Sequence, residues 1–377
     1  MSTLTSDLER LNNPQRFAQI EQMHRRAFSW QRQGYIPLGV HVANPQHIRG
    51  VDYSQRLDAE VFFWIHSRYL LDTLQVGSDL LPVVGMNHLG NVLVPSMFGA
   101  EQFVPDVMCA SLQDVGPTPL AVLVGIEEVE DLQSPGMDSG ILPQVQAMGR
   151  YYRRHLPDWV AIVGTMCEGP FSMAMEMRGS SLLVDLVDHP QLSQRLITLC
   201  ARTQANVERN FRQMMGTLTN PFFTNFGIAG TGLRLGDDSI CNLSPEMIGR
   251  FCGPAYQIII EIWGGCGHVH CCSLEHSRFE HLFETLARIP EVAVFSTQFG
   301  FEYYQEHLEE LRGRLAIESF YGDAYSYVCR QHGSFRNWAN EFVPRFKNES
   351  GLVLYTQVES VEEGKEIHAY WKEAHEL

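Results

Sequence analysis

The sequence predicts a single (β/α)8 barrel, and three observations lead to that prediction. Strand-like runs rich in β-branched residues alternate with amphipathic helical stretches over most of the chain. Repeated units of this kind favour parallel strands joined by crossover helices. The strand-like runs number about eight, which favours a closed barrel over an open sheet. No G-x-G-x-x-G motif follows the first strand, so a dinucleotide-binding sheet is disfavoured.

Composition agrees with one soluble domain that spans residues 1–377. The chain is 45% hydrophobic and 19% charged, which is ordinary for a globular protein. Barrels with insertions reach this length as one unit. The net charge of −16 and the lack of a Lys/Arg cluster argue against nucleic-acid and membrane partners. The polar N-terminus does not resemble a signal peptide and no apolar run is long enough to span a bilayer, so we expect a cytoplasmic protein.

The nine cysteines are an odd number. In a cytoplasmic chain of this size they are better interpreted as thiols or metal ligands than as disulfides.

Residues 1–78 are predicted to form a mainly helical N-terminal extension. A helix is expected from about residue 13 to 33, because Asn13-Pro14 can start it and Gly34 can end it. A short strand at 35–42 follows, and apolar residues at helical spacing predict a second helix at 58–74.

Strands and helices then alternate. The expected strands are 120–126, 159–164, 222–235, 267–272, 292–297, 315–320 and 352–357. The expected helices are 143–155, 190–215, 245–263, 278–288, 304–312, 335–346 and 362–373.

The segment from Gly267 to His276 (GHVHCCSLEH) offers the strongest candidate site. Chemistry in such barrels lies at the C-terminal ends of strands. Alternation along the strand places His268, His270 and Cys272 on one face. A His-x-Cys pair can bind zinc, and zinc stabilises a thiolate at neutral pH. The alternative is a strand end with buried thiols and hydrogen-bonded imidazoles that bind no metal.

Carboxylates follow two other predicted strands. Asp237 and Asp238 come after the strand at 222–235, and two neighbouring carboxylates favour a raised pKa in one of them. We therefore expect an acid–base role, with an ordinary solvated turn as the alternative. Ser244 and the proline after it predict a helix start. Glu168 lies at a Gly-Pro turn after the strand at 159–164 and should face the mouth of the barrel.

Weaker candidates for lining the substrate site also follow predicted strands, and each alone is more often structural. These residues are Asn87, His88, Asn91, Gln298, Glu318, Tyr321 and Asp323.

Together these segments resemble the uroporphyrinogen decarboxylase superfamily, a TIM-barrel group. The turn from Glu168 to Phe171 is similar to its G-P-F element, and Arg178-Gly179 follows at its usual spacing. The stretch from Asp237 to Met247 resembles D-D-x-x-x-L-S-P-E-x, and His270-Cys271-Cys272 falls where relatives carry H-x-C-G. The resemblance covers roughly residues 80 to 375, and it implies that Phe171 and Arg178 contact the substrate.

The resemblance implies one of two chemistries. The decarboxylases bind a tetrapyrrole without a metal and use an M-R-Q-A-G-R element, whereas residues 35–49 here keep one arginine. The other branch comprises zinc-dependent methyltransferases that move a methyl group between a corrinoid protein and a thiol such as coenzyme M. The chain is closer to this branch, because an acidic protein supplies few cationic partners for a substrate with many carboxylates.

In the methyltransferase branch, zinc is held by the His and Cys of H-x-C and by a later cysteine. His270 and Cys272 match the first two ligands. The last strand of this chain leads into Val358-Glu359-Ser360, without a cysteine. We expect the remaining ligands among His268, His276, Cys329 and Glu359.

Three functions follow from these expectations. The first is a methyltransferase-type enzyme that acts on a small molecule, assisted by zinc and by a corrinoid on a partner protein. The second is a cofactor-free decarboxylase that uses Asp237 or Asp238. The third is a non-catalytic binding protein. A homodimer is compatible with the resemblance, because barrels of this group often pair.

Overall fold

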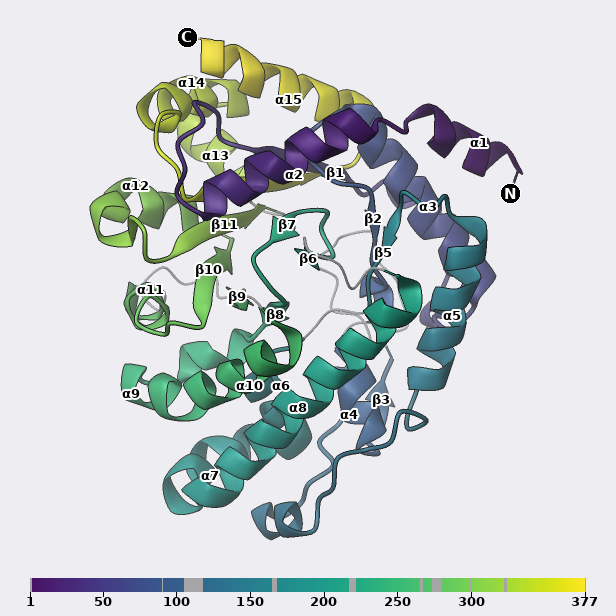
Figure 1. Ribbon diagram of the computed structural model, residues 1–377, viewed down its shortest axis with the longest axis vertical. Helices are drawn as coiled ribbons and strands as arrows, with labels where there is room; N and C mark the ends of the chain where they lie inside the picture. The colour runs from purple at the N-terminus through teal and green to yellow at the C-terminus, as the bar shows by residue number, and fades with distance from the viewer. Residues whose placement is uncertain are drawn as a thin grey trace.

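The computed structural model describes residues 2–89, 91–104, 118–164, 168–216, 222–264, 267–272, 280–298, 300–321 and 324–376. It is an α/β structure with a mainly parallel sheet (Figure 1). In these residues, no helix combines the length and apolar character that crossing a membrane requires. The described cysteines form no disulfide with one another; they are Cys200, Cys241, Cys252, Cys271, Cys272 and Cys329.

Six parallel strands form the main sheet in the order β1-β12-β11-β10-β9-β8. Their bounds are β1 Leu38–Val42, β8 Arg234–Gly236, β9 Gly267–His270, β10 Val292–Thr297, β11 Ala316–Tyr321 and β12 Leu352–Val358. From β8 to β12 each strand lies beside its predecessor in sequence, as expected when every crossover has the same hand. Figure 1 shows the strands inside a ring of helices.

Shorter ladders complete the strand arrangement. They are formed by β2 Val83–Val84 with β5 Ala161–Ile162, β3 Gln102–Phe103 with β4 Thr118–Pro119, and β6 Phe222–Phe223 with β7 Ala229–Gly230. The β2–β5 ladder is parallel, and the other two are antiparallel. A single bridge joins Glu168 to Gly236 of β8. Among the described residues no ladder joins β1 to β2.

The helices pack outside the strands. They are α1 Ser2–Arg10, α2 Pro14–Phe28, α3 Ala59–Val76, α4 Leu93–Met97, α5 Leu142–His155, α6 Pro170–Arg178, α7 Leu182–Asp188, α8 Pro190–Met215, α9 Pro245–Met247, α10 Gly253–Trp263, α11 Glu280–Leu286, α12 Gly300–Leu311, α13 Ala324–His332, α14 Phe335–Phe346 and α15 Val361–Glu376. Short 3₁₀ turns lie at 45–48, 53–55, 87–89, 126–130, 179–181 and 238–242, and a π-helical turn at 248–252 joins α9 to α10.

Local sequence explains where these helices begin. Asn13 caps α2 by accepting a hydrogen bond from the Arg16 N–H, and a proline occupies its first turn. Asp58 caps α3 in the same way. Ser244 accepts from the Met247 N–H at the start of α9, so the helix start predicted there is confirmed.

Two strand predictions are wrong. Residues 120–126 form no strand, because the N–H groups of Val122 and Leu123 both donate to the Met177 carbonyl and Val124 is exposed. The strand expected at 222–235 is divided into β6, β7 and β8, with a turn at Gly227 (φ 75°) between β6 and β7. The segment predicted as a helical N-terminal extension also contributes β1 to the main sheet.

The parallel strands give the sheet two distinct edges. Strands β8 to β12 begin at the N-terminal edge and end at the C-terminal edge. Helix α2 lies at the N-terminal edge and contacts β7, β11 and β12. There the N–H of Gly351, just before β12, donates to the Ala27 carbonyl.

The last two helices pack through aromatic rings. Trp338 of α14 and Trp371 of α15 are stacked, with centroids 5.8 Å apart and an interplanar angle of 21°. Trp371 is fully buried, and its indole N–H donates to the Ile36 carbonyl at 2.8 Å. This contact holds α15 against the segment that leads into β1.

Candidate metal centre

Three potential metal ligands converge at the C-terminal edge. His270 is the last residue of β9, Cys272 follows two residues later, and Asp238 follows β8. Their ligand atoms all lie within 4.8 Å of one another. His270 Nε2 is 2.6 Å from Cys272 Sγ, and Asp238 Oδ1 accepts a hydrogen bond from the Cys272 N–H at 2.7 Å. We call these three residues the metal centre.

The donor set of the metal centre fits zinc. Nitrogen, sulfur and carboxylate oxygen are the ligand types that zinc takes in proteins, and a fourth position stays open at catalytic sites. Burial, followed by the charge of Arg234, lowers the pKa of His270 well below its usual range, so the imidazole is neutral and can ligate. Burial, followed by the charge of Asp238, raises the pKa of the Cys272 thiol. A bound cation would reverse that effect, because it stabilises the thiolate.

A buried polar network lies directly behind His270. Ser296 Oγ is 3.0 Å from His270 Nδ1 and donates to Glu318 Oε1 at 3.1 Å. These three residues stand opposite one another on β9, β10 and β11. A serine and a carboxylate behind a histidine fix its ring, and here they leave Nε2 directed toward Cys272 Sγ.

Glu318 is the hub of this network. It is fully buried, and its carboxylate lies 2.7 Å from His268 Nε2 and 3.4 Å from Arg234 Nε. Burial alone would raise the pKa of Glu318, but the charges of His268 and Arg234 and the hydrogen bond to His268 outweigh it and lower the pKa to about 2. The Arg234 guanidinium also donates to Ser296 Oγ at 3.1 Å. We refer to Arg234, His268, Ser296 and Glu318 as the buried network.

Carboxyl groups gather beside the metal centre. Glu168 is 8% exposed, and burial raises its pKa well above the usual range, with the charges of Glu176 and Asp238 adding to the effect. Burial, followed by the charges of Asp238 and Asp237, raises the pKa of Glu176, whose side chain accepts a hydrogen bond from Asn91. Burial raises the pKa of Asp238 as well. We call Glu168, Glu176 and Asp238 the carboxyl cluster. These shifts favour its protonated forms, whereas a cation bound at the metal centre would stabilise the carboxylate of Asp238.

Asp237 has a different environment from Asp238. Its carboxylate is fully buried and accepts from the Ser172 N–H at 2.7 Å and the Tyr256 hydroxyl at 2.8 Å. It therefore caps the first turn of α6 from outside the helix. Gly169 permits this approach, because a Cβ at that position would lie 2.2 Å from Asp237 Cβ. Burial raises the pKa of Asp237 to about 6.

The other residues predicted for the substrate site lie in different surroundings. His88 stacks on Phe62 and contacts the Arg56 carbonyl at 2.9 Å. Phe171 is fully buried in the core, and Arg178 forms a 2.9 Å ion pair with Asp185. These contacts occupy side chains that were expected to face a substrate.

Gln298 follows β10 and is 6% exposed. The side chains of Asn87 and Tyr321 lie outside the described part of the structure.

The residues expected to complete the metal shell are not the residue that lies beside His270 and Cys272 in the structure. His268 is paired with Glu318, Cys329 packs against the core from α13, and Glu359 is exposed after β12. His276 lies outside the described residues. Within the described chain the third ligand atom at the metal centre comes from Asp238, for which an acid–base role was expected.

The sequence interpretation missed the supporting residues. Ser296, Arg234 and Glu176 carry no motif, and neither serine nor arginine inside a strand indicates a ligand shell by itself. A usable signal is strand register. Arg234 stands opposite His268, and two residues further along the strands Ser296 stands opposite both His270 and Glu318, so polar residues recur at two successive levels of adjacent strands.

Comparison with known proteins supports the fold. No known protein family and no curated protein matches the sequence. Among solved structures, the chain is similar to a methyltransferase from Methanosarcina mazei, with a TM-score of 0.66 over 94% of this chain and 98% of that one. The two sequences are 13% identical, so the likeness is one of fold.

Proposed function

We propose that this chain is a methyltransferase-type enzyme built as a closed (β/α)8 barrel, in which Asp238, His270 and Cys272 hold a zinc ion. The observation that carries the proposal is the convergence of three zinc-type donor atoms at the C-terminal edge, with Ser296 and Glu318 behind the histidine. The similar fold of a methyltransferase supports the choice of reaction.

The metal would supply Lewis acidity, which holds a thiol as its thiolate at neutral pH. The chain's own residues do the rest. Ser296 and Glu318 orient His270 so that its Nε2 faces the metal centre. Asp238 ties the Cys272 backbone to the centre through the N–H of Cys272. The methyl donor is a small methylated compound or a corrinoid on a partner protein.

Methyl transfer to a thiolate forms a carbon–sulfur bond and releases the donor's leaving group. A leaving group of the amine or alkoxide kind must take up a proton. Glu168 is the group that can supply it, because burial and neighbouring carboxyl groups keep it protonated. The thiol's own proton leaves to solvent when the thiolate forms.

The decarboxylase alternative is less well supported by this geometry. A substrate with many carboxylates needs several cations at the mouth. Beside the metal centre the described residues present the carboxyl cluster, and Arg234 is already paired with Glu318.

Zinc analysis of the purified protein tests the proposal. We expect about one zinc per chain, as for a mononuclear site. Cys272→Ser and Asp238→Asn should weaken zinc affinity by more than about 100-fold, since even outer-shell partners are worth 10- to 100-fold. Cys329→Ser is the matched control, because that thiol packs against the core from α13 and should leave zinc binding unchanged.

A second assay tests the reaction. With methylcobalamin as donor and 2-mercaptoethanesulfonate as acceptor, the zinc-loaded protein should demethylate methylcobalamin, which is measured as a loss of its absorbance. The Cys272→Ser variant should show no such loss. Zinc binding without transfer to any thiol would reject the methyltransferase assignment and favour a metal-binding protein of another kind. Absence of stoichiometric zinc would reject the metal centre itself.

A further inference from the structure

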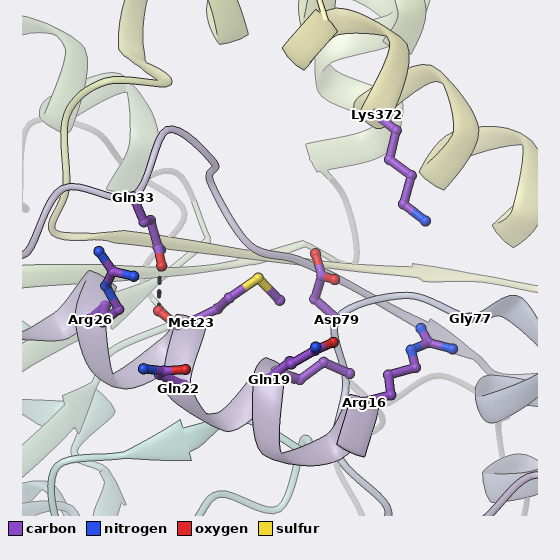
Figure 2. Close-up of a pocket in the computed structure, with 10 residues that line it drawn as sticks. Arg16, Gln19, Gln22, Met23, Arg26, Gln33, Gly77, Asp79 and Lys372 are labelled. Carbon is purple, nitrogen blue, oxygen red and sulfur yellow. Dashed lines mark hydrogen bonds between the residues drawn. The ribbon is translucent and has the colours of Figure 1, made fainter. Parts of the chain in front are cut away.

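A polar cavity lies at the N-terminal edge of the sheet, opposite the edge that carries the metal centre. It has a volume of about 610 Å³ and opens between α2 and α15 (Figure 2). We call it the basic cavity; its lining residues include Arg16, Gln22, Arg26, Gln33, Asp79 and Lys372.

The basic cavity is separate from the metal centre. Asp79 Oδ2 accepts from the N–H of Leu38, where β1 begins, so the cavity lies at the N-terminal edge. A strand of five residues separates the two edges by roughly 17 Å. Residues at this edge of a barrel ordinarily serve stability.

Three cations of the basic cavity lack acidic partners. In the described part of the chain, no carboxylate lies within 4.0 Å of Arg16, Arg26 or Lys372. This is unusual in a chain with net charge −16, where Arg25, on the same helix, pairs with Glu21. The charge of the three cations is therefore available to a ligand.

The two arginines are held in place by backbone carbonyls. Arg16 donates to the Ser78 carbonyl at 2.8 Å, and Arg26 donates to the Arg32 carbonyl at 2.9 Å. Each guanidinium has five N–H donors, so most remain free for oxyanions. Lys372 extends from α15 into the same space (Figure 2).

One buried carboxylate faces the cavity among these cations. Asp79 is 6% exposed, and its Oδ2 accepts from the Tyr35 hydroxyl at 2.8 Å as well as from the Leu38 N–H. No hydrogen bond to Oδ1 exists among the described residues, and Figure 2 shows the carboxylate directed into the cavity. Asp79 would accept a hydrogen bond from a ligand hydroxyl and repel a ligand that offers only oxyanions there.

We propose that the basic cavity binds a small organic polyanion that also carries a hydroxyl group. Two or more carboxylate or phosphate groups would meet Arg16, Arg26 and Lys372, and the hydroxyl would donate to Asp79. A volume of about 610 Å³ lies within the range of small-molecule sites. Such a ligand bridges α2 and α15, so its binding stabilises the folded chain. This assignment does not depend on the proposed methyltransferase activity.

Calorimetric titration with matched ligands tests the site. Citrate has three carboxylates and one hydroxyl, and tricarballylate differs from it only by lacking the hydroxyl. We expect one citrate per chain, bound about tenfold more tightly than tricarballylate, because a hydrogen bond to a charged group has this effect. Equal affinities for citrate and tricarballylate would show that Asp79 does not bind the ligand hydroxyl. A parallel titration with fructose 1,6-bisphosphate shows whether phosphate or carboxylate is preferred.

Charge-removing variants identify the binding residues. Arg26→Gln and Lys372→Gln should each weaken citrate binding by about three- to tenfold. Arg345→Gln is the control, because it removes the same charge from an exposed arginine that stacks on Phe346 of α14. If the calorimetric signal came from citrate chelating a metal, Lys372→Gln would leave that signal unchanged. Identical citrate affinities in all variants would overturn the proposal. So would the absence of binding at a citrate concentration of about 10 mM, at which even a weak anion site should be occupied.

A thermal melt gives an independent measurement. Citrate should raise the melting temperature of the wild type, and Arg26→Gln should lose most of that shift while Arg345→Gln keeps it. An equal shift in both variants would mean that citrate acts as a general solvent additive.

Discussion

The two edges of the sheet gather different ionisable groups, with carboxyl groups at one edge and cationic side chains at the other. At the C-terminal edge the metal centre lies among buried carboxyl groups, whereas the N-terminal edge presents Arg16, Arg26 and Lys372 around a single acid. Helix polarity accounts for Asp237 at the C-terminal edge, which accepts from the Ser172 N–H in the first turn of α6, but not for Arg16, which lies in the first turn of α2. In a βαβ unit each helix begins near the C-terminal edge, where its free N–H groups attract carboxylates, and ends near the other edge, where cations are favoured.

The edges also differ in how completely their polar groups are paired. The buried network interlocks across four neighbouring strands, with distances of 2.7 to 3.4 Å. In the basic cavity Arg16 and Arg26 donate to backbone carbonyls, and among the described residues neither has an acidic partner. Substitution at the C-terminal edge should therefore cost stability and metal affinity, while substitution at the N-terminal edge should change only ligand affinity.

The largest effect is expected at Glu318. Glu318→Gln would leave Arg234 and His268 buried without a counter-charge, and breaking a buried pair in this way costs about 3–5 kcal/mol. Urea unfolding measures the change. Glu310→Gln, which removes an exposed partner of His307, should stay within about 0.5 kcal/mol of wild type. Equal losses in the two variants would contradict the distinction between buried and exposed pairs.

Asp237 should make stability depend on pH. Its pKa is raised in the folded state from 3.8 to about 6, so between these values the folded chain binds more protons than the unfolded chain. Asp237 therefore contributes about 3 kcal/mol to the free energy of unfolding below pH 4, and this contribution is lost as the pH rises through 6.

Asp237→Asn should remove this dependence and keep the contact to Ser172. We expect the difference in unfolding free energy between variant and wild type to change by about 3 kcal/mol from pH 4 to pH 7. Tyr256→Phe removes a hydrogen bond that favours the ionised carboxylate of Asp237. The stabilising contribution of Asp237 should therefore be lost at a higher pH in this variant. Parallel stability curves for wild type and Asp237→Asn would show that this carboxyl is ionised throughout.

Ser296 should affect the metal more than the fold. Ser296→Ala breaks the connection between His270 and Glu318 and should weaken zinc binding by about 10- to 100-fold. Competition with a chelating dye measures the affinity. Ser319→Ala is a buried control on β11, whose hydroxyl donates to the carbonyls of Thr297 and Gln298. If both variants bind zinc alike, Ser296 has no positioning role.

The smallest effect is expected at Ser244. Ser244→Ala removes the cap of α9 and should cost about 1 kcal/mol of stability. Zinc affinity should not change, because the cap has no contact with the metal centre. A loss of zinc in this variant would mean that the end of β8 is coupled to the helix start after it.

Local sequence signals predicted much of this structure. The parallel alternation of strands and helices, the break at 35–42 and the cap at Ser244 follow from short-range patterns. The proximity of His270 and Cys272 follows from strand alternation. That such groups lie at a C-terminal edge follows from the polarity of parallel strands.

Long-range register was beyond the reach of the same signals. Asp237 and Asp238 are neighbours in sequence, yet one caps α6 and the other lies at the metal centre. Which role each takes depends on Gly169 and Tyr256, which are distant in the chain. The position of Ser296 between His270 and Glu318 depends on how β10 aligns with β9 and β11.

The stacked indoles of Trp338 and Trp371 give the molecule an optical property. Two aromatic transitions at 5.8 Å and 21° couple and produce a near-ultraviolet circular dichroism band that neither ring gives alone. Lys372 is the next residue after Trp371, so a ligand that draws this lysine toward α2 would alter the band. Occupancy of the basic cavity could then be followed without a label, and Trp338→Phe would abolish the signal.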